Sequence, residues 1–302
     1  MGKNNGQNPE AITMFTGKGG VGKTTCAAAA ALHYSTLGNQ TLVLSTDATP
    51  SLSHIFELED ESRPAKVTEF LRVMELGIDE VMEMWDGKFG TEVYEVFSSF
   101  VDIEYSRFAD FMSSVLPGLS DEFMIDYIRE LNLAGIYNAI VWDTAPLGQT
   151  LALLETPAML TQHLKMAPRI YSKLKLGGIS HEPVLDILKR WEEISAVNMD
   201  FIRNGVSFNM VTIPEALAVE QLDGIFSKMD EYGLAVTRLI INNVVKDADS
   251  DFLRTRAEQQ KYYLETIYGM YSRLEIVELP MFPYELKGLD RLTEIEKALF
   301  PG

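Results

Sequence analysis

The sequence predicts an α/β fold, a doubly wound and mostly parallel sheet with an inserted α-helical subdomain. Three observations lead to this prediction. A short apolar strand at residues 11–15 runs through a glycine-rich turn into an alanine-rich helix that opens at Lys23. A second apolar strand, 41–46, follows that helix, and a strand–helix–strand crossover of this kind makes the two strands parallel. A helical pattern over 81–133 then interrupts the alternation of strands and helices.

The turn between the first strand and the helix matches a phosphate-binding loop, the P-loop of NTPases. Gly17, Gly22, Lys23 and Thr24 satisfy the spacing G-x-x-x-x-G-K-[ST]. Backbone N–H groups wrap a phosphate chain in such a loop, and the positive end of the following helix adds to the attraction. Lys23 would contact the β- and γ-phosphates, and the Thr24 hydroxyl would hold Mg²⁺. A nucleotide site is therefore expected, with a glycine-rich turn and a stray lysine as the alternative.

Two aspartates stand at the ends of apolar strands. Asp47 follows the strand 41–46, and Asp143 closes the strand 139–142. Ligands of parallel sheets bind at the carboxyl ends of the strands, so both carboxylates should face the phosphates. Asp143 matches the position at which a carboxylate orders Mg²⁺ through water. The glycine-containing loop over 143–154 would lie beside the γ-phosphate.

Further strands are expected at 70–76, 208–212, 238–243 and 275–279. Asn242 stands at the end of one of them, where an asparagine can either hydrogen-bond a base edge or cap the turn. The segment 280–283, Pro-Met-Phe-Pro, is a rigid apolar loop that could pack on an adenine ring. The last helix, 289–300, is expected to pack on the sheet through Leu292, Ile295 and Leu299.

The expected organisation is a nucleotide-binding core at 1–80, 136–156 and 205–302 with helical insertions at 81–135 and 157–204. Pro117-Gly118 breaks the first insertion, and a helix starting near Phe123 follows. Methionine suits an adaptable apolar groove, but it is also an ordinary core residue. The insertions contain Met82, Met84, Met112, Met124, Met159, Met166 and Met199. The sequence leaves both interpretations of these methionines open.

Composition limits the partners and the compartment. The formal net charge of -18 and the pI near 4.6 argue against nucleic acid and anionic lipid as main partners, although an acidic surface can also be a solubility adaptation. The single cysteine, Cys26, allows neither an intrachain disulfide nor a cysteine-based metal site, and it is expected to be a buried packing residue. The amino-terminal residues hold no apolar signal core. A cytoplasmic location is the default expectation.

Taken together, these stretches resemble the family of arsenite-pump ATPases and tail-anchored-protein targeting ATPases over nearly the whole chain. The resemblance implies ATP and Mg²⁺ as cofactors, with Thr24 and Asp143 at the metal and Asp47 as the catalytic aspartate. It implies ATP-binding roles for Gly17, Lys18, Gly19, Gly20, Val21, Gly22, Lys23, Thr24 and Thr25 in the loop. It also implies nucleoside contacts from Glu215, Asn242, Phe282 and Pro283.

The second lysine of the loop, Lys18, is the residue from which a homodimer is expected. An ordinary phosphate loop does not need it, and a lysine is costly to order unless an anion compensates. In the family that GKGGVGKTT resembles, the corresponding lysine reaches across a homodimer to the partner's nucleotide. Lys18 is therefore expected to act with Lys23 and Asp47 in hydrolysis.

The sequence also departs from the family pattern. The first switch usually reads Asp-Pro-Ala-His/Ser-Asn, whereas residues 47–51 read Asp-Ala-Thr-Pro-Ser. Ser250 and Leu253 lie about where a dimer-bridging Cys-x-x-Cys zinc motif would fall, so no zinc is expected. Gln149 stands where a histidine is common.

The helical blocks fall where targeting members carry a hydrophobic groove, so the expected client is the apolar transmembrane helix of a tail-anchored protein. Contact with a membrane or a membrane receptor would be at most transient. One alternative is the ATPase of an arsenite or other oxyanion efflux system, against which the lack of cysteines counts. Another is a spatial-organiser ATPase of the partition or division type, which would lack the long helical insertions.

Overall fold

The computed structural model describes residues 11–46, 51–58, 63–91, 94, 98, 104, 117–144 and 182–301. Contacts divide the chain into two compact units. The sheet unit comprises Met1–Leu76, Ala134–Thr150 and Gly205–Gly302, and the helical unit comprises Gly77–Leu133 and Leu151–Asn204. The domain boundaries expected from the sequence stay a prediction.

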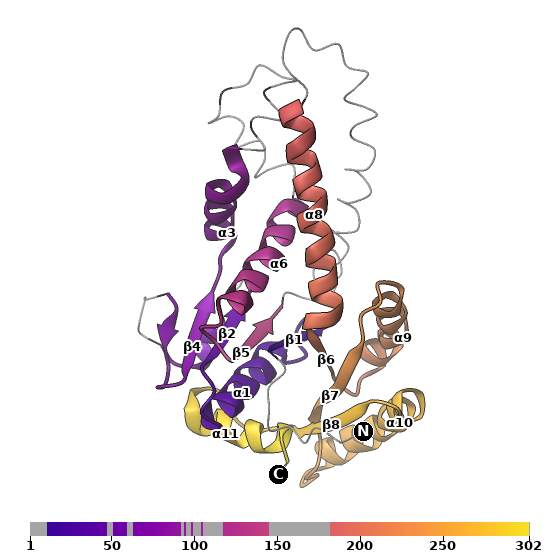
Figure 1. The fold of residues 1–302 in the computed structure, drawn as a ribbon. Coiled ribbons are helices and arrows are strands. Elements are labelled where there is room, and N and C mark those ends of the chain that lie inside the picture. Colours follow the sequence, from indigo (N-terminus) through magenta and orange to yellow (C-terminus); the bar gives the residue numbers. More distant parts are fainter. Residues whose placement is uncertain are drawn as a thin grey trace, which may run out of the picture. The chain divides into compact units, whose positions relative to one another are not determined.

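In the described chain, eight strands form one sheet in the order β3-β4-β2-β5-β1-β6-β7-β8 (Figure 1). The strands are β1 Ile12–Gly17, β2 Thr41–Ser45, β3 Ala65–Lys66, β4 Leu71–Glu75, β5 Ala139–Asp143, β6 Ser207–Thr212, β7 Val236–Val244 and β8 Glu275–Pro280. Neighbouring strands are parallel, except that β3 is antiparallel to β4. The predicted mostly parallel α/β fold is confirmed. The sequence did not indicate β3, because two residues are too few to show an alternating pattern.

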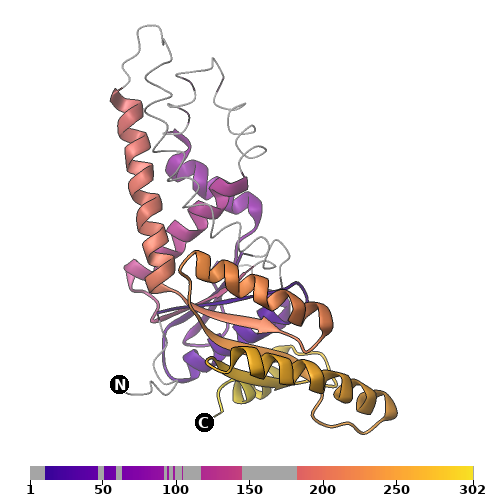
Figure 2. The same ribbon diagram turned by 90° about the vertical axis from the view of Figure 1, so that its right-hand side faces the viewer.

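Helices cover both faces of this sheet. They are α1 Lys23–Thr36, α2 Leu52–Ile55, α9 Ala216–Glu231, α10 Asp251–Tyr271 and α11 Gly288–Leu299. Helices α1 and α11 pack together on one face, where the predicted residues Leu292, Ile295 and Leu299 are buried in one hydrophobic cluster with the alanines of α1. Helices α9 and α10 lie side by side in front of β6–β8 in Figure 2, with the rings of Phe226 and Tyr271 stacked 4.4 Å apart.

Helix α10, with 21 residues, was not predicted from the sequence. Its buried side chains are Gln260 and Ile267, so the stripe of apolar residues at Leu253, Leu264, Ile267 and Tyr271 is interrupted by a polar glutamine. A start signal was nevertheless present. Ser250 is the N-cap, its hydroxyl accepts a hydrogen bond from the Leu253 N–H at 3.3 Å, and Asp251 opens the first turn.

The helical unit contains α3 Ile78–Trp85, the π-helical turn η1 Asp86–Gly90, α6 Pro117–Ala134 and α8 Glu182–Gly205. The π-helical turn, with a glycine at either end of its Gly-Lys-Phe-Gly stretch, interrupts the helix expected from residue 81. Helix α6 begins at Pro117 and not near Phe123, since proline is favoured in the first helical turn. Within the two expected insertions, residues 92–116 and 157–181 lie outside the described residues, apart from Tyr94, Ser98 and Glu104.

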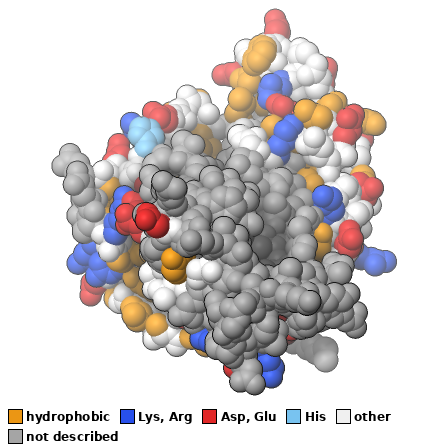
Figure 3. Space-filling view, turned by 90° about the horizontal axis from the view of Figure 1, so that it is seen from above, with side chains coloured by type: hydrophobic (Ala, Val, Ile, Leu, Met, Phe, Trp, Pro, Cys, Tyr) orange, Lys and Arg blue, Asp and Glu red, His pale blue; other side chains and the backbone are white. Residues whose placement is uncertain are grey.

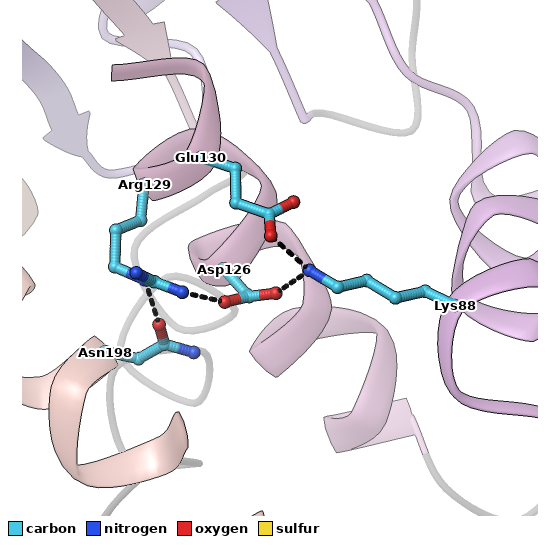
Figure 4. A network of polar contacts seen from close by, with 5 residues as sticks. All are labelled: Lys88, Asp126, Arg129, Glu130 and Asn198. Carbon is cyan, nitrogen blue, oxygen red and sulfur yellow. Dashed lines mark hydrogen bonds and ion pairs between the residues drawn. The ribbon is translucent and has the colours of Figure 1, made fainter. Parts of the chain in front are cut away.

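A charged network holds the described part of the helical unit together (Figure 4). The carboxylate of Asp126 is only 2% exposed and pairs with the ammonium of Lys88 and, at 2.6 Å, with the guanidinium of Arg129. Lys88 also pairs with Glu130 at 2.8 Å, and Arg129 Nε donates to Asn198 Oδ1 at 3.0 Å. The network therefore ties η1, α6 and α8 to one another.

The charges of this network change the pKa of Lys88. Burial lowers the pKa of Lys88, but hydrogen bonds to Asp126 and Glu130 outweigh it and raise the pKa above its ordinary value of 10.5. Two of the methionines that sequence analysis left undecided, Met124 and Met199, are buried in the helical unit and serve as core residues. Met112, Met159 and Met166 lie outside the described residues.

The described surface carries both signs of charge. In the view of Figure 3, acidic and basic side chains are interspersed with hydrophobic ones over the coloured part of the molecule. No helix among the described residues has the length and apolar character needed to cross a bilayer.

Candidate nucleotide site

The predicted site residues converge because the parallel strands end at one edge of the sheet. Ser45 on β2 stands level with Glu75 on β4 and with Asp143 on β5. Asp143 is in turn level with Phe15 on β1, two residues before Gly17. The carboxyl edge of the sheet therefore brings the phosphate loop and the end of β5 together, as parallel-sheet geometry requires.

Close packing explains the glycines of the loop. A Cβ on Gly17 would lie 2.2 Å from the carbonyl oxygen of Val211, so only glycine lets β1 and β6 approach there. Gly22 has a φ of +95°, a left-handed conformation that side chains disfavour, and it is the N-cap of α1. With no Cβ at either position, backbone N–H groups are free to approach a phosphate chain.

Lys23 begins α1 and lies almost buried, with 6% of its surface exposed. Its Nζ donates to the carbonyl oxygen of Lys18 at 3.3 Å, so the ammonium is folded back over the loop. The side chain of Lys18 is partly exposed. The two lysines of the motif thus differ in placement, one curled into its own loop and the other at its surface.

Asp143 and Thr24 have the chemistry that Mg²⁺ prefers. Asp143 is fully buried, and its Oδ2 accepts a hydrogen bond from the Ser45 hydroxyl at 3.1 Å. Thr24 is partly buried in the first turn of α1. A carboxylate and a hydroxyl are hard oxygen ligands, so these residues fit the metal of an ATP site. In the part of the chain that the structure describes, no group of three or more His, Cys, Asp and Glu side chains could hold a metal ion.

Asp47 lies outside the described residues, but both flanks of its segment are well defined. On one side, Thr46 N–H donates to the Asp143 carbonyl at 3.1 Å, and the Trp142 indole donates to the Thr46 hydroxyl at 3.1 Å. On the other side, Glu75 accepts hydrogen bonds from Ser51 and from Leu52 at the start of α2.

Glu75 is a site residue that sequence analysis did not single out. Its Oε1 accepts from the N–H groups of Ser51 and Leu52, both at 2.7 Å, and its Oε2 accepts from the Ser53 hydroxyl at 2.6 Å. One carboxylate thus caps α2 from outside the helix. The signal was visible in the sequence, since Glu75 ends an apolar strand just as Asp143 does.

Asn242 lies against the phosphate loop. Its Nδ2 donates to the Val21 carbonyl oxygen at 2.9 Å and would lie 2.3 Å from a Cβ placed on Gly22. A carbonyl only accepts, so this bond orients the amide with its nitrogen toward the loop. The structure thereby brings Asn242 to the loop that holds Lys23, and its role in reading a base stays a prediction.

The other predicted nucleoside residues are placed differently. Glu215 is the N-cap of α9, and its carboxylate forms an ion pair with Arg256 of α10. Phe282 is partly buried against the hydrophobic cluster of the sheet unit, while Pro283 is exposed. Their contacts with a nucleoside remain predicted.

Cys26 is fully buried on α1, as expected of a packing residue. Burial, with a smaller contribution from the charge of Asp143, raises the pKa of its thiol to about 12. At neutral pH the thiol is therefore protonated and unreactive.

A phosphate loop on a parallel sheet, with a buried lysine at the start of the following helix and an aspartate closing the neighbouring strand, defines a nucleoside triphosphatase of the P-loop class. The chain belongs to the anion-transporting ATPase family, whose model matches residues 10–301. This confirms the family that the motifs indicated and the ATPase activity expected from them.

Relatives of this chain carry two kinds of name, arsenical pump-driving ATPase and GET3 ATPase. The chain is 32% identical over 299 residues to the "Putative arsenical pump-driving ATPase 2" of Aquifex aeolicus (strain VF5), covering 95% of this chain and 98% of the relative. It is 29% identical over 293 residues to "ATPase GET3A" of Arabidopsis thaliana, covering 91% and 80%. It is 25% identical over 294 residues to "ATPase GET3" of Rhodotorula glutinis, covering 92% and 84%.

Proposed function

We propose that this ATPase works as a homodimer that uses ATP and Mg²⁺ to bind and deliver tail-anchored membrane proteins through a hydrophobic groove in its helical insertions. The placement of Lys18 supports the dimer. Lys23 is nearly buried over its own loop, whereas Lys18 is partly exposed beside Gly19 and Gly20. A partly exposed cation at the rim of a phosphate site is suited to a nucleotide on another subunit.

In this proposal each residue has a distinct task. Lys23 and the loop N–H groups hold the phosphates, and Thr24 with Asp143 would hold Mg²⁺, which neutralises charge on the phosphates. Asp47 orients or deprotonates the attacking water. Lys18 of the partner subunit stabilises the charge that develops in the transition state, a role worth on the order of 10³–10⁵ in rate.

A mixing experiment tests the cross-dimer role. Lys18→Ala and Asp47→Asn should each lower steady-state ATP hydrolysis by on the order of 10³-fold. If Lys18 acts across the dimer, mixed dimers of the two variants regain one active site, because one subunit supplies Asp47 and the other supplies the lysine. Lys261→Ala, at an exposed lysine of α10, is the control and should hydrolyse ATP normally. Mixed dimers as inactive as either parent would show that Lys18 acts within its own subunit.

The client assignment rests on the family resemblance and on the GET3 name of several relatives. Leu133 and Val197, on α6 and α8, are exposed hydrophobic residues of the helical unit, at 70% and 49%. The test is co-purification with a protein that ends in a transmembrane segment, compared with the same protein lacking that segment. Equal recovery of both would rule out the targeting function.

The name of the Aquifex relative favours a second candidate, the ATPase of an arsenical efflux system. Trivalent arsenic binds thiolates, yet the chain has a single cysteine. That residue, Cys26, is buried, and its thiol has a pKa raised to about 12, so it is protonated at neutral pH. Stimulation of ATP hydrolysis by arsenite, without binding of an apolar client, would support this candidate over the first.

A further inference from the structure

The end of β7, where Asn242 stands, departs from regular strand geometry. The register between β7 and β8 shifts between Ile241 and Val244, which marks a bulge. Asn243 has a φ of +60°, in the left-handed region that asparagine tolerates better than most residues. A bulge bends its strand and redirects the side chains beside it. Here it accompanies an Asn242 side chain that lies on the phosphate loop.

One buried side chain holds this bulge. Gln260 of α10 is 3% exposed, its Oε1 accepts from the Val245 N–H at 2.8 Å, and its Nε2 donates to the Asn243 carbonyl at 2.9 Å. The amide therefore spans Val244, whose own carbonyl accepts from the Met281 N–H at 2.9 Å. Backbone groups that the bulge removes from the strand ladder are satisfied in this way, as buried polar groups must be.

Helix α10 contacts the other predicted nucleoside residue as well. Arg256, one helical turn before Gln260, forms the ion pair with Glu215 at the start of α9. Residues four apart lie on the same helix face. A single face of α10 thus touches both segments that are expected to contact the nucleoside.

We propose that Gln260 is a positioning residue for nucleobase selection, which sets the Asn242 amide for adenine by holding the bulge at Asn243–Val245. This inference rests on the base-reading role of Asn242 in the proposed function. With its Nδ2 toward Val21, Asn242 keeps Oδ1 and its second N–H for a base. Adenine offers a donor and an acceptor on one edge, whereas guanine places a carbonyl oxygen where adenine has its amino group.

The experiment compares the ATP-to-GTP ratio of kcat/KM among variants. Asn242→Ala should lower the ratio about tenfold, in line with the discrimination of a bidentate amide contact. Gln260→Met removes both backbone hydrogen bonds at similar side-chain volume and should also lower the ratio by several-fold to tenfold. In Gln260→Glu the carboxylate still accepts from Val245 but faces the Asn243 carbonyl, so the ratio should fall again. Gln259→Met makes the same change at the exposed neighbouring glutamine and should keep the wild-type ratio.

The outcomes separate the two proposals. If Asn242→Ala lowers the ratio but both Gln260 variants melt earlier with the wild-type ratio, Gln260 is only structural and this inference is wrong. If Asn242→Ala itself keeps the ratio, the base-reading role fails, and the positioning role fails with it. The double variant Asn242→Ala/Gln260→Met should have the same ATP-to-GTP ratio of kcat/KM as Asn242→Ala, because Gln260 acts through Asn242. Where Gln260→Met does not fold, Gln260→Glu decides the question in the same assay.

Discussion

The two buried amides at the sheet edge and the buried carboxylate of the helical unit are satisfied by different kinds of partner. At the sheet edge, Gln260 and Asn242 are uncharged amides that hydrogen-bond backbone groups, and Thr144 donates its hydroxyl to the Phe15 carbonyl at 2.9 Å. In the helical unit, the buried carboxylate of Asp126 is held between two cations, Lys88 and Arg129 (Figure 4).

This difference predicts how substitutions in each region affect stability. A buried backbone group that loses a neutral hydrogen-bond partner costs about 1–3 kcal/mol. A buried charge that loses its partner costs about 3–5 kcal/mol. Substitutions of the sheet-edge amides should therefore change catalysis as well as stability, whereas substitutions in the charged network should change stability alone.

The largest effect is expected from Asp126→Ala. Removing the carboxylate leaves Lys88 and Arg129 without their shared acceptor and should lower the free energy of unfolding by about 1.5–3 kcal/mol, because both cations remain partly exposed to water. Urea denaturation measures the loss, and peptide-resolved hydrogen exchange should place it in α6 and not in α1. The control is Glu130→Ala, at a network carboxylate that is 52% exposed, with an expected loss below about 1 kcal/mol. Similar losses in the two variants would mean that burial does not set the strength of the network.

An intermediate effect is expected from Glu75→Ala. The variant loses the acceptor for Ser51, Leu52 and Ser53 next to the segment that carries Asp47. Turnover of ATP should fall about tenfold, since a misplaced catalytic group costs up to 10²-fold, while the dissociation constant for ATP stays near that of the wild type. Steady-state kinetics and equilibrium binding of a fluorescent ATP analogue measure the two quantities. Glu69→Ala, at an exposed glutamate before β4, should leave both unchanged. A variant that lost affinity but kept its turnover would contradict this view of Glu75.

The smallest effect concerns alkaline pH. The folded-state pKa of Lys88 lies above 10.5, so the stability that its charge contributes is complete below that pH and is lost as the pH rises through the folded pKa. The stability difference between wild type and Lys88→Met should therefore be constant from pH 7 to about 10 and shrink above it. The pH-dependent part of this difference should stay below about 1 kcal/mol, because Lys88 is 32% exposed and screened. Urea titrations of both proteins across this range measure it. A difference that shrinks below pH 9 would assign the effect to another group.

Local patterns predicted most of the sheet unit. Apolar runs that end in Asp or Asn marked β2, β5 and β7, and the three leucine and isoleucine positions of the last helix are buried as expected. These predictions succeed because a strand or an amphipathic helix shows its buried face within a few residues. Helix α10 escaped because its buried positions are few and one of them is the polar Gln260. The π-helical turn was not predicted because five residues show no sequence period that is specific to a π-helix.

The sequence by itself determined the phosphate loop and, through it, the class of enzyme. The spacing from Gly17 to Thr24 specifies a backbone path that needs no distant residue to be recognised. Only the tertiary structure decided that Asn242, 221 residues further along, would donate to Val21, and that Gln260 would hold the bulge beside it. Such partners follow from how β7, α10 and the loop pack together, and packing over that distance leaves no mark in the local spacing of residues.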